Sequence, residues 1–302
     1  MSKDKIATVN IYLHKFCIMF VSALLLGASM FICHKKGFNA GVDFAGGFVV
    51  EVACNECNGG EIAGKISKKL GTSVFHQQID GGYLFKSANT GANYDETLGI
   101  YKDILMGYGK DIKIVKTDFA SPQMTASFLK DSIFACLFAF ACIGIYMMIR
   151  FNWKFAVSGV LALVYDVLLV LGCISAMQIE VCLITLTALL TIIGYCINDK
   201  IVVFDRIRSN LWDRKQPVAS IVLTSVKSVL ARSVLTSFTT IITTTSLLFF
   251  GDRSIFELGL TIICGIFFGT LSSLFIAPSL LLLLRITHHK PKVEKDLMFY
   301  AS

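Results

Sequence analysis

Charged side chains are scarce in this sequence. Lys, Arg, Asp and Glu together make up 16% of its 302 residues, whereas 55% of the residues are hydrophobic. Soluble domains carry about 25% charged residues, so this composition excludes an ordinary soluble domain and indicates a polytopic membrane protein. The sequence also lacks a nucleic-acid-binding motif, so its net charge of +7 gives no separate case for nucleic acid as a partner.

A second closely spaced pair of cysteines is missing as well. Cys54 and Cys57 form one such pair among ten cysteines, and the other eight lie in or at the ends of apolar segments. A zinc site needs two further ligands, and a cysteine in an apolar segment behaves as a small hydrophobe. We therefore predict no metal and no cofactor. A local disulfide between Cys54 and Cys57 and two incidental thiols both stay open.

Six apolar segments are long enough to cross a membrane, because a helix needs about 20 apolar residues to span ~30 Å of hydrocarbon. These segments cover approximately residues 13–33, 131–149, 155–177, 181–204, 229–250 and 257–284. Lys and Arg gather on one side, whereas the short opposite loops hold only Arg253. The positive-inside rule therefore predicts cytoplasmic N- and C-termini. The first span is long for the apolar region of a signal peptide, so we predict that it is an uncleaved anchor.

The predicted spans divide the chain into four parts. Residues 1–33 are the cytoplasmic N-terminus and first transmembrane helix, 34–127 a periplasmic domain, 128–285 transmembrane helices two to six, and 286–302 a cytoplasmic tail. Gly265 and Gly269, four residues apart in the last span, predict close helix packing, and Pro278 predicts a bend.

The insertion at residues 34–127 has the periodicity of a small folded domain. Strand patterns around 48–52, 73–79, 83–86 and 112–114 alternate with helical patterns around 62–70 and 94–105. The order β-α-β-β-α-β is that of the ferredoxin-like α+β fold. We therefore expect a ferredoxin-like domain on the outer side that contacts something outside the membrane.

Two aspartates interrupt the apolar spans. Asp199 lies near the cytoplasmic end of the fourth span, and Asp166 lies near the middle of the third. An ionised Asp in hydrocarbon costs about 2.5 to 3.5 kcal/mol, so such a residue faces the bundle interior or water and has a partner or a function. For Asp166, a hydrogen bond to a neighbouring helix and a functional role are both open. Lys200, about 100° round the helix from Asp199, can extend to the cytoplasmic surface.

The fifth span carries a polar stripe that begins at Arg232. At 100° per residue, the members of this stripe fall within about 40° of one line. They are Arg232, Thr236, Thr239, Thr243 and Ser246. We interpret the stripe as a hydrated or proton-conducting face, with ordinary Ser and Thr packing as the alternative.

Asp199 and Arg232 lie at comparable distances from the cytoplasmic ends of neighbouring antiparallel spans, so we expect them to meet at similar depth. A carboxylate that pairs with an arginine in one state and meets solvent in another can carry protons across a membrane. The glycine-rich stretch 41–47 is less informative by itself. Its paired glycines permit positive φ, and Asp43 can cap a turn.

Three stretches together resemble the SecF family of the bacterial SecDF translocase. Residues 194–208 (GYCINDKIVVFDRIR) are similar to its fourth-span signature, 41–47 (GVDFAGG) to its external motif, and 230–237 (LARSVLTS) to its fifth-span motif. Lys200 departs from the small hydroxyl residue that the family usually has at this position. The matching motif residues are Asp43, Phe44, Gly46, Gly47, Gly194, Asn198, Asp205 and Arg206.

This resemblance implies a subunit of the Sec protein-export machinery that is not an enzyme. Such a subunit uses the proton motive force with SecD to assist polypeptide translocation across the bacterial inner membrane. The implied partners are SecD, the SecYEG channel with YajC, unfolded polypeptide and the lipid bilayer. The implied coupling ion is the proton, with Na⁺ as the alternative. The implied proton-pathway residues are Asp199, Arg232 and Asp166, to which the polar stripe adds Thr236 and Thr239.

Three other functions compete with this one. A proton-coupled small-molecule transporter of the resistance-nodulation-division type uses the same kind of bundle, although the small external domain leaves little room for a drug site. An intramembrane aspartyl protease also uses two carboxylates, but Ile197-Asn198 precedes Asp199 where that class has Gly-x-Gly. A passive scaffold needs neither aspartate.

Overall fold

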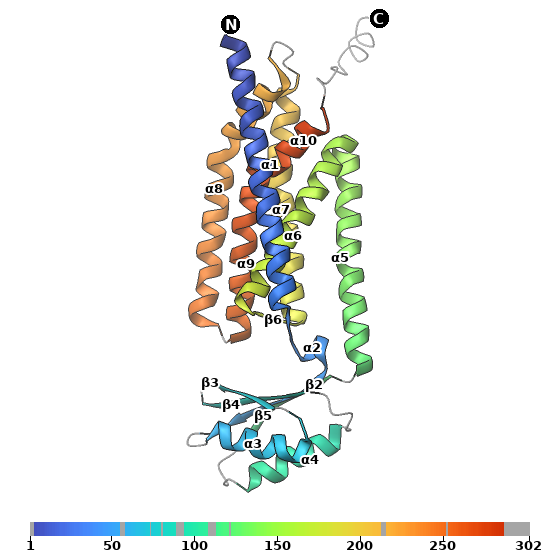
Figure 1. The fold of residues 1–302 in the computed structure, drawn as a ribbon, viewed down its shortest axis with the longest axis vertical. Coiled ribbons are helices and arrows are strands. Elements are labelled where there is room, and N and C mark those ends of the chain that lie inside the picture. Colours follow the sequence, from blue (N-terminus) through green and yellow to red (C-terminus); the bar gives the residue numbers. More distant parts are fainter. Residues whose placement is uncertain are drawn as a thin grey trace, which may run out of the picture. The chain divides into compact units, whose positions relative to one another are not determined.

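The computed structural model of the chain is shown in Figure 1. It describes residues 3–54, 58–72, 74–79, 81–88, 94–107, 113–120, 122–212, 216–251 and 253–286. The chain divides into two compact units. A helical unit comprises Met1–Phe38, Cys136–Ile179 and Ile184–Ser302, and an α/β unit comprises Asn39–Ala135 and Glu180–Leu183.

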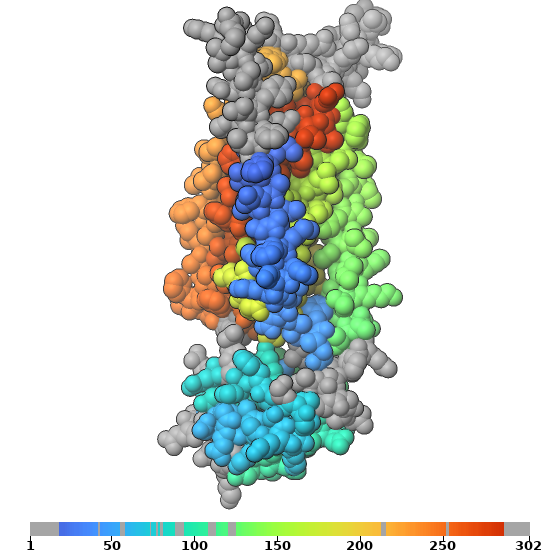
Figure 2. Space-filling view, in the orientation of Figure 1, coloured from blue at the N-terminus to red at the C-terminus, as the bar shows by residue number. Residues whose placement is uncertain are grey.

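Six long helices coincide with the six predicted spans, and each is long and apolar enough to cross a membrane. The helices are α1 (Lys3–Lys36), α5 (Pro122–Arg150), α6 (Trp153–Met177), α7 (Leu183–Asn210), α8 (Val218–Phe250) and α9 (Arg253–Leu271). The last span continues from α9 through a π-helix, η1 (Ser272–Ile276), into α10 (Ala277–Leu283). In Figure 2 the coloured part of α1 lies over the front of the helical unit.

The helical unit has a continuous apolar core that includes Met147, Phe155, Phe204 and Leu281. The rings of Phe155 and Phe204 meet edge to face with centroids 5.4 Å apart, a favourable arrangement for aromatic side chains. Helix α6 packs against α1 and α9, and α8 packs against α9.

The two glycines of the last span permit a close approach between α9 and α7. A Cβ atom on Gly265 would lie 2.4 Å from Cδ1 of Ile192, and one on Gly269 would lie 2.1 Å from Sγ of Cys196. Neither distance leaves room for a methyl group. The predicted close packing at these glycines is therefore confirmed.

The π-helix η1 comes directly before Pro278. Its last hydrogen bond runs from the N–H of Ala277 to the carbonyl of Ser272, five residues earlier. Proline has no N–H and cannot complete the usual bond to the fourth preceding carbonyl, so the helix accommodates it in a wider turn. This turn places Ser272 and Ser273 in the interior, where both are 0% exposed.

The α/β unit contains the four strands and two helices that the periodicity predicts, although Ile112 lies outside the described residues. They are β2 (Gly47–Ala53), α3 (Gly59–Leu70), β3 (Val74–Ile79), β4 (Gly82–Ala88), α4 (Tyr94–Met106) and β5 (Lys113–Ala120). The strands form one antiparallel sheet in the order β3-β4-β2-β5.

The core of the α/β unit lies between this sheet and its two helices. Phe48 and Val50 of β2 are buried against Ile66 of α3 and Tyr101 of α4, and the rings of Phe48 and Tyr101 lie 5.4 Å apart. Burial raises the pKa of Tyr101 above its usual value of 10.0, although the nearby hydroxyl of Ser87 acts in the opposite direction.

Cys54, at the end of β2, is disulfide-bonded. Cys57, the partner considered from the sequence, lies outside the described residues.

Two short elements complete the α/β unit. Strand β1 (Asn39–Ala40) pairs in parallel with β6 (Glu180–Val181), which comes directly before the fourth span. Between β1 and β2 lies the single turn α2 (Val42–Ala45). Neither β1 nor β6 is marked by a strand pattern in the sequence, because each contributes only two residues.

Candidate ion-coupling site

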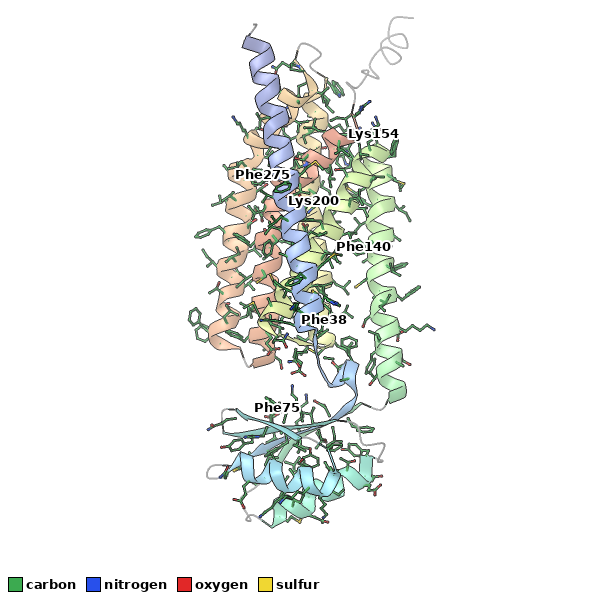
Figure 3. The ribbon with its side chains drawn as sticks, in the orientation of Figure 1. Phe38, Phe75, Phe140, Lys154, Lys200 and Phe275 are labelled. Carbon is green, nitrogen blue, oxygen red and sulfur yellow. The ribbon has the colours of Figure 1, made fainter. Side chains whose placement is uncertain are left out.

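Lys200 is fully buried. Its Nζ atom, on α7, lies 2.5 Å from Oδ2 of Asp166 on α6 and 3.4 Å from Oγ of Ser273 in η1. The exposed fractions of the Lys200 and Asp166 side chains are 0% and 1%. Figure 3 labels Lys200 within the helical unit.

The prediction that Lys200 extends to the cytoplasmic surface is therefore wrong. A buried ammonium needs an opposite charge and hydrogen-bond acceptors to offset the loss of water. Asp166 and Ser273 provide both, from two separate elements. The direct partner of Asp166 is thus the ammonium of Lys200 on a neighbouring helix.

Asp199 has a different environment one residue away. It is 5% exposed, and its Oδ2 atom has no hydrogen-bond partner among the described residues. Two cations act on it electrostatically, Lys200 more strongly and Arg232 of α8 less strongly. Asp199 is thus a buried carboxylate with an unused oxygen atom near two positive charges.

Arg232 and the threonines beside it lie on an exposed face of α8. The hydroxyls of Thr236 and Thr239 donate to carbonyl groups of their own helix, those of Ser233 and Thr236, at 3.0 and 2.9 Å. Among the described residues no ion pair joins Arg232 to Asp199. The described chain therefore leaves this polar face uncovered.

The buried polar face of α8 is a different one. Ser233 and Ser237 are 2% and 5% exposed, and Oγ of Ser237 lies 2.6 Å from Oγ1 of Thr270 on α9. The hydroxyl of Tyr195 on α7 donates to Ser237 at 3.3 Å. Sequence reasoning missed this face, although Ser233 and Ser237 stand four residues apart and so share one side of the helix.

The external motif holds the beginning of α7. Oδ2 of Asp43 accepts a hydrogen bond from the backbone N–H of Leu183, the first residue of α7, at 2.9 Å. The N–H of Gly41 donates to the carbonyl of Val181 at 2.8 Å, and the N–H of Phe44 donates to the carbonyl of Gly41. Asp43 therefore caps a helix far along the chain rather than a turn of its own.

The paired glycines at the end of this motif have the positive φ angles that the sequence predicts. The angle is 73° at Gly46 and 146° at Gly47. A side chain at either position would be strained, because L-residues other than glycine rarely adopt such angles.

The remaining motif residues of α7 lie apart from the buried aspartates. Gly194 and Asn198 are exposed and four residues apart, on one face of the helix. At the cytoplasmic end predicted from the sequence, Asp205 pairs with Arg150 of α5 at 3.0 Å, and Arg206 donates to Ser228 of α8 at 3.0 Å. Arg206 therefore contacts α8 rather than either buried aspartate.

Known proteins share this sequence over most of its length. Residues 100–287 match the family described as "Protein export membrane protein SecD/SecF, C-terminal". The chain is 35% identical over 283 residues to "Protein translocase subunit SecF" of Haemophilus influenzae, across 92% of this chain and 87% of that protein. The chain belongs to the SecF family. SecF of Sebaldella termitidis is 34% identical over 283 residues, across 91% of each chain.

Solved SecDF structures share the fold with this SecF-family chain. The crystal structure of SecDF, a translocon-associated membrane protein from Thermus thermophilus, matches with a TM-score of 0.78 at 30% identity. The match covers 89% of this chain and 37% of that longer chain. SecDF in the super-membrane-facing form matches with a TM-score of 0.62 at 26% identity. The chain is thus a multi-pass membrane protein and a SecF-type subunit in protein translocation.

Proposed function

We propose that this SecF-family chain uses the proton motive force, together with SecD, to assist the translocation of unfolded polypeptide. In this proposal it lies in the bacterial inner membrane with both termini in the cytoplasm, beside the SecYEG channel with YajC. The observation that carries the proposal is Asp199, a carboxylate buried in a membrane span with an oxygen atom that no described group binds.

Asp199 is the proton carrier in this mechanism. It gains a proton from the outer side and loses it to the cytoplasm, and Arg232 compensates the charge of its ionised form. Thr236 and Thr239 extend the polar face of α8 outward from Arg232. Each proton that crosses releases about 2.3 kcal/mol per 100 mV of membrane potential, which is available to move other parts of the protein. Na⁺ in place of the proton is the alternative coupling ion.

The exposed face of α8 supports SecD as a partner. Arg232, Thr236 and Thr239 are exposed in the chain alone, and a charged side chain against lipid is costly. A second set of helices that covers this face would remove that cost. The SecDF chain that matches this one is much longer, and the present chain spans 37% of it.

The α/β unit is the part that we propose to contact polypeptide on the periplasmic side. Its element order and its strand order, β3-β4-β2-β5, support a ferredoxin-like fold. Val74 and Ile114 pack on the core, so their neighbours Phe75 and Val115 point to the opposite face of the sheet. These two side chains are 64% and 62% exposed, and Figure 3 labels Phe75. Exposed apolar side chains on the two outer strands of the sheet suit contact with an extended, unfolded chain.

The test is protein export into membrane vesicles that contain this chain and SecD, with and without a membrane potential. Asp199→Asn keeps the size of the side chain but cannot ionise, so we expect it to abolish the dependence of export on the potential. Asp205→Asn is the matched control, because Asp205 is 53% exposed in a pair with Arg150. Wild-type behaviour of Asp199→Asn would contradict the proposal and favour a passive scaffold.

A small-molecule transporter of the same superfamily gives a different result. In that case, efflux of a hydrophobic cation from vesicles would depend on this chain and on Asp199, whereas export would not. The aspartyl protease alternative predicts that purified protein cleaves a membrane substrate and that either Asp→Asn change abolishes cleavage.

A further inference from the structure

The buried pair of Lys200 and Asp166 implies different roles for the two intramembrane aspartates. We propose that Lys200 is a tethered counter-cation that keeps Asp166 ionised as a structural group, so that Asp199 alone of the two exchanges protons. The role of Asp199 rests on the proposed function, whereas the role of the pair does not.

Geometry distinguishes the two carboxylates. Asp166 holds the ammonium of Lys200 at 2.5 Å, with Ser273 of η1 as the second partner of that ammonium. Within the described chain neither Oδ1 of Asp166 nor Oδ2 of Asp199 has a hydrogen-bond partner, so the direct contact of Lys200 with Oδ2 of Asp166 is what distinguishes the two carboxylates. One cation therefore binds one carboxylate directly and leaves the other able to change its protonation state.

Burial makes the pair an all-or-none arrangement. Lys200 and Asp166 are 0% and 1% exposed, so neither can replace its partner with water. Loss of one charge would leave the other buried without compensation, which is strongly unfavourable. A proton exchanged at Asp166 would leave Lys200 in that situation, whereas a proton exchanged at Asp199 leaves the pair intact.

Asp199 is the other ionisable acid close to Lys200, which acts on it electrostatically. Ser272 of η1 and Cys196 of α7 are the other polar neighbours of Asp166, and Lys200 is the one cation that acts on it among the described residues. Gly269 of α9 also lies close to the pair, because a Cβ atom built on it would be 3.9 Å from Oδ2 of Asp166. As a glycine, it contributes no polar side chain there. Arg232 acts on Asp199 instead. In the part of the chain that the structure describes, no second cation is placed to take over from Lys200.

The pair and its hydrogen bond to Ser273 also join three elements of the helical unit. Asp166 belongs to α6, Lys200 to α7, and Ser273 to the π-turn before Pro278. Because the partners come from different elements, the pair positions α7 relative to α6 and η1. Lys200 is thus a positioning residue, and its charge holds the helix that carries Asp199.

Chemical labelling of the wild-type chain tests the proposal. Dicyclohexylcarbodiimide adds to protonated carboxyl groups in apolar surroundings, and mass spectrometry of peptides locates the adduct. With the full chain in proteoliposomes, we expect an adduct on Asp199 and none on Asp166. In Lys200→Met, Asp166 loses its cation and takes up a proton, so we expect labelling to appear on it. An adduct on Asp166 in the wild-type chain, or none on Asp199, would overturn the proposal.

A double-variant comparison provides a second measurement. Asp166→Asn and Lys200→Met should each lower the melting temperature of the chain, and the combination should recover most of the loss. The charge-swapped variant Asp166→Lys with Lys200→Asp keeps an ion pair, and it replaces the neutral combination in this comparison if that combination does not fold. Export that stays dependent on the potential in a folded double variant supports the proposal, and loss of that dependence contradicts it. If the labelling pattern is as expected but Asp199→Asn has no effect on export, only the proposed function is refuted.

Discussion

Asp43 accepts a hydrogen bond at 2.9 Å from the backbone N–H of Leu183, a residue 140 positions later in the chain. A carboxylate at the first residue of a helix satisfies an otherwise unpaired N–H group and interacts favourably with the helix dipole. The helix in question is α7, which also carries Asp199 and Lys200. The external motif of this SecF-family chain therefore stabilises the start of the helix on which the candidate site is built.

Asp43→Ala should destabilise the chain by about 0.5 to 2 kcal/mol, the usual range for the loss of a helix cap. Asp43→Asn keeps an acceptor oxygen and should cost less. Hydrogen exchange at the amide of Leu183 gives the most direct measurement, and we expect faster exchange in Asp43→Ala. Unchanged protection of this amide would show that the cap contributes nothing.

Lys200→Met should destabilise the chain by about 3 to 5 kcal/mol, the usual cost of removing one partner of a buried pair, because Asp166 loses its cation and must take up a proton to avoid a buried, uncompensated charge. Arg150→Met removes one member of an exposed pair, in which Arg150 and Asp205 are 48% and 53% exposed. This control should cost about 0 to 1 kcal/mol. Equal losses of unfolding free energy in the two variants would contradict the structural role of Lys200.

Gly265→Ala should destabilise the bundle by about 1 to 3 kcal/mol, because the added methyl group overlaps Ile192. Ile192→Ala should rescue it by making room at the point of overlap. Gly27→Ala, in α1, is the matched control, since no atom lies within 4 Å of its added Cβ. Thermal unfolding of Gly265→Ala, of its combination with Ile192→Ala and of Gly27→Ala measures the effect, and a stable Gly265→Ala would mean that α9 and α7 can separate at low cost.

Arg232→Met should abolish the dependence of export on the membrane potential without a large loss of stability, since Arg232 is exposed in the chain alone. Arg232→Lys keeps the positive charge and should retain part of the dependence. Arg206→Met, which removes the exposed contact with Ser228, is the control and should behave as wild type. Full coupling in Arg232→Met would remove Arg232 from the proton pathway.

Tyr101 should make the chain less stable at alkaline pH. Burial raises its pKa in the folded state above 10.0, so the folded state holds the phenol proton more tightly than the unfolded state does. The resulting stability is fully present below the unfolded pKa of about 10 and is lost as pH rises through the folded pKa. Tyr101→Phe has no proton to lose, so we expect its unfolding free energy to fall less between pH 9 and pH 11, roughly one unit on either side of the usual tyrosine pKa. Identical alkaline slopes in the two proteins would refute this prediction.

Local patterns predicted much of the fold. The six spans follow from the length of apolar segments, and the strands and helices of the α/β unit follow from alternation and helical spacing. Gly265 and Gly269 predicted a close approach because small residues four apart share one side of a helix. The sequence did not identify Ile192 and Cys196 as the residues they meet, because that depends on how α9 is rotated against α7.

The candidate site was only partly predictable for a related reason. Asp199 and Asp166 stand out because a carboxylate in an apolar segment is costly wherever the helix points. The direction of Lys200 was predicted wrongly, because a lysine near a helix end can reach water unless an acid on another helix offers a buried partner. Asp43 was assigned to a local turn, since nothing near it in the sequence indicates Leu183.

The amino-acid sequence alone determined that this is a six-span membrane protein of the SecF family with two costly aspartates in its spans. These conclusions depend on composition, periodicity and the order of motifs, and all three can be recognised from residues that lie near one another in the sequence. Only the tertiary structure decided that Lys200 belongs to Asp166 and that Asp199 keeps an oxygen atom that no described group binds. The physical reason is that a charge buried in a bundle takes its partner from whichever helix faces it, and helix rotation is set by packing across the whole unit.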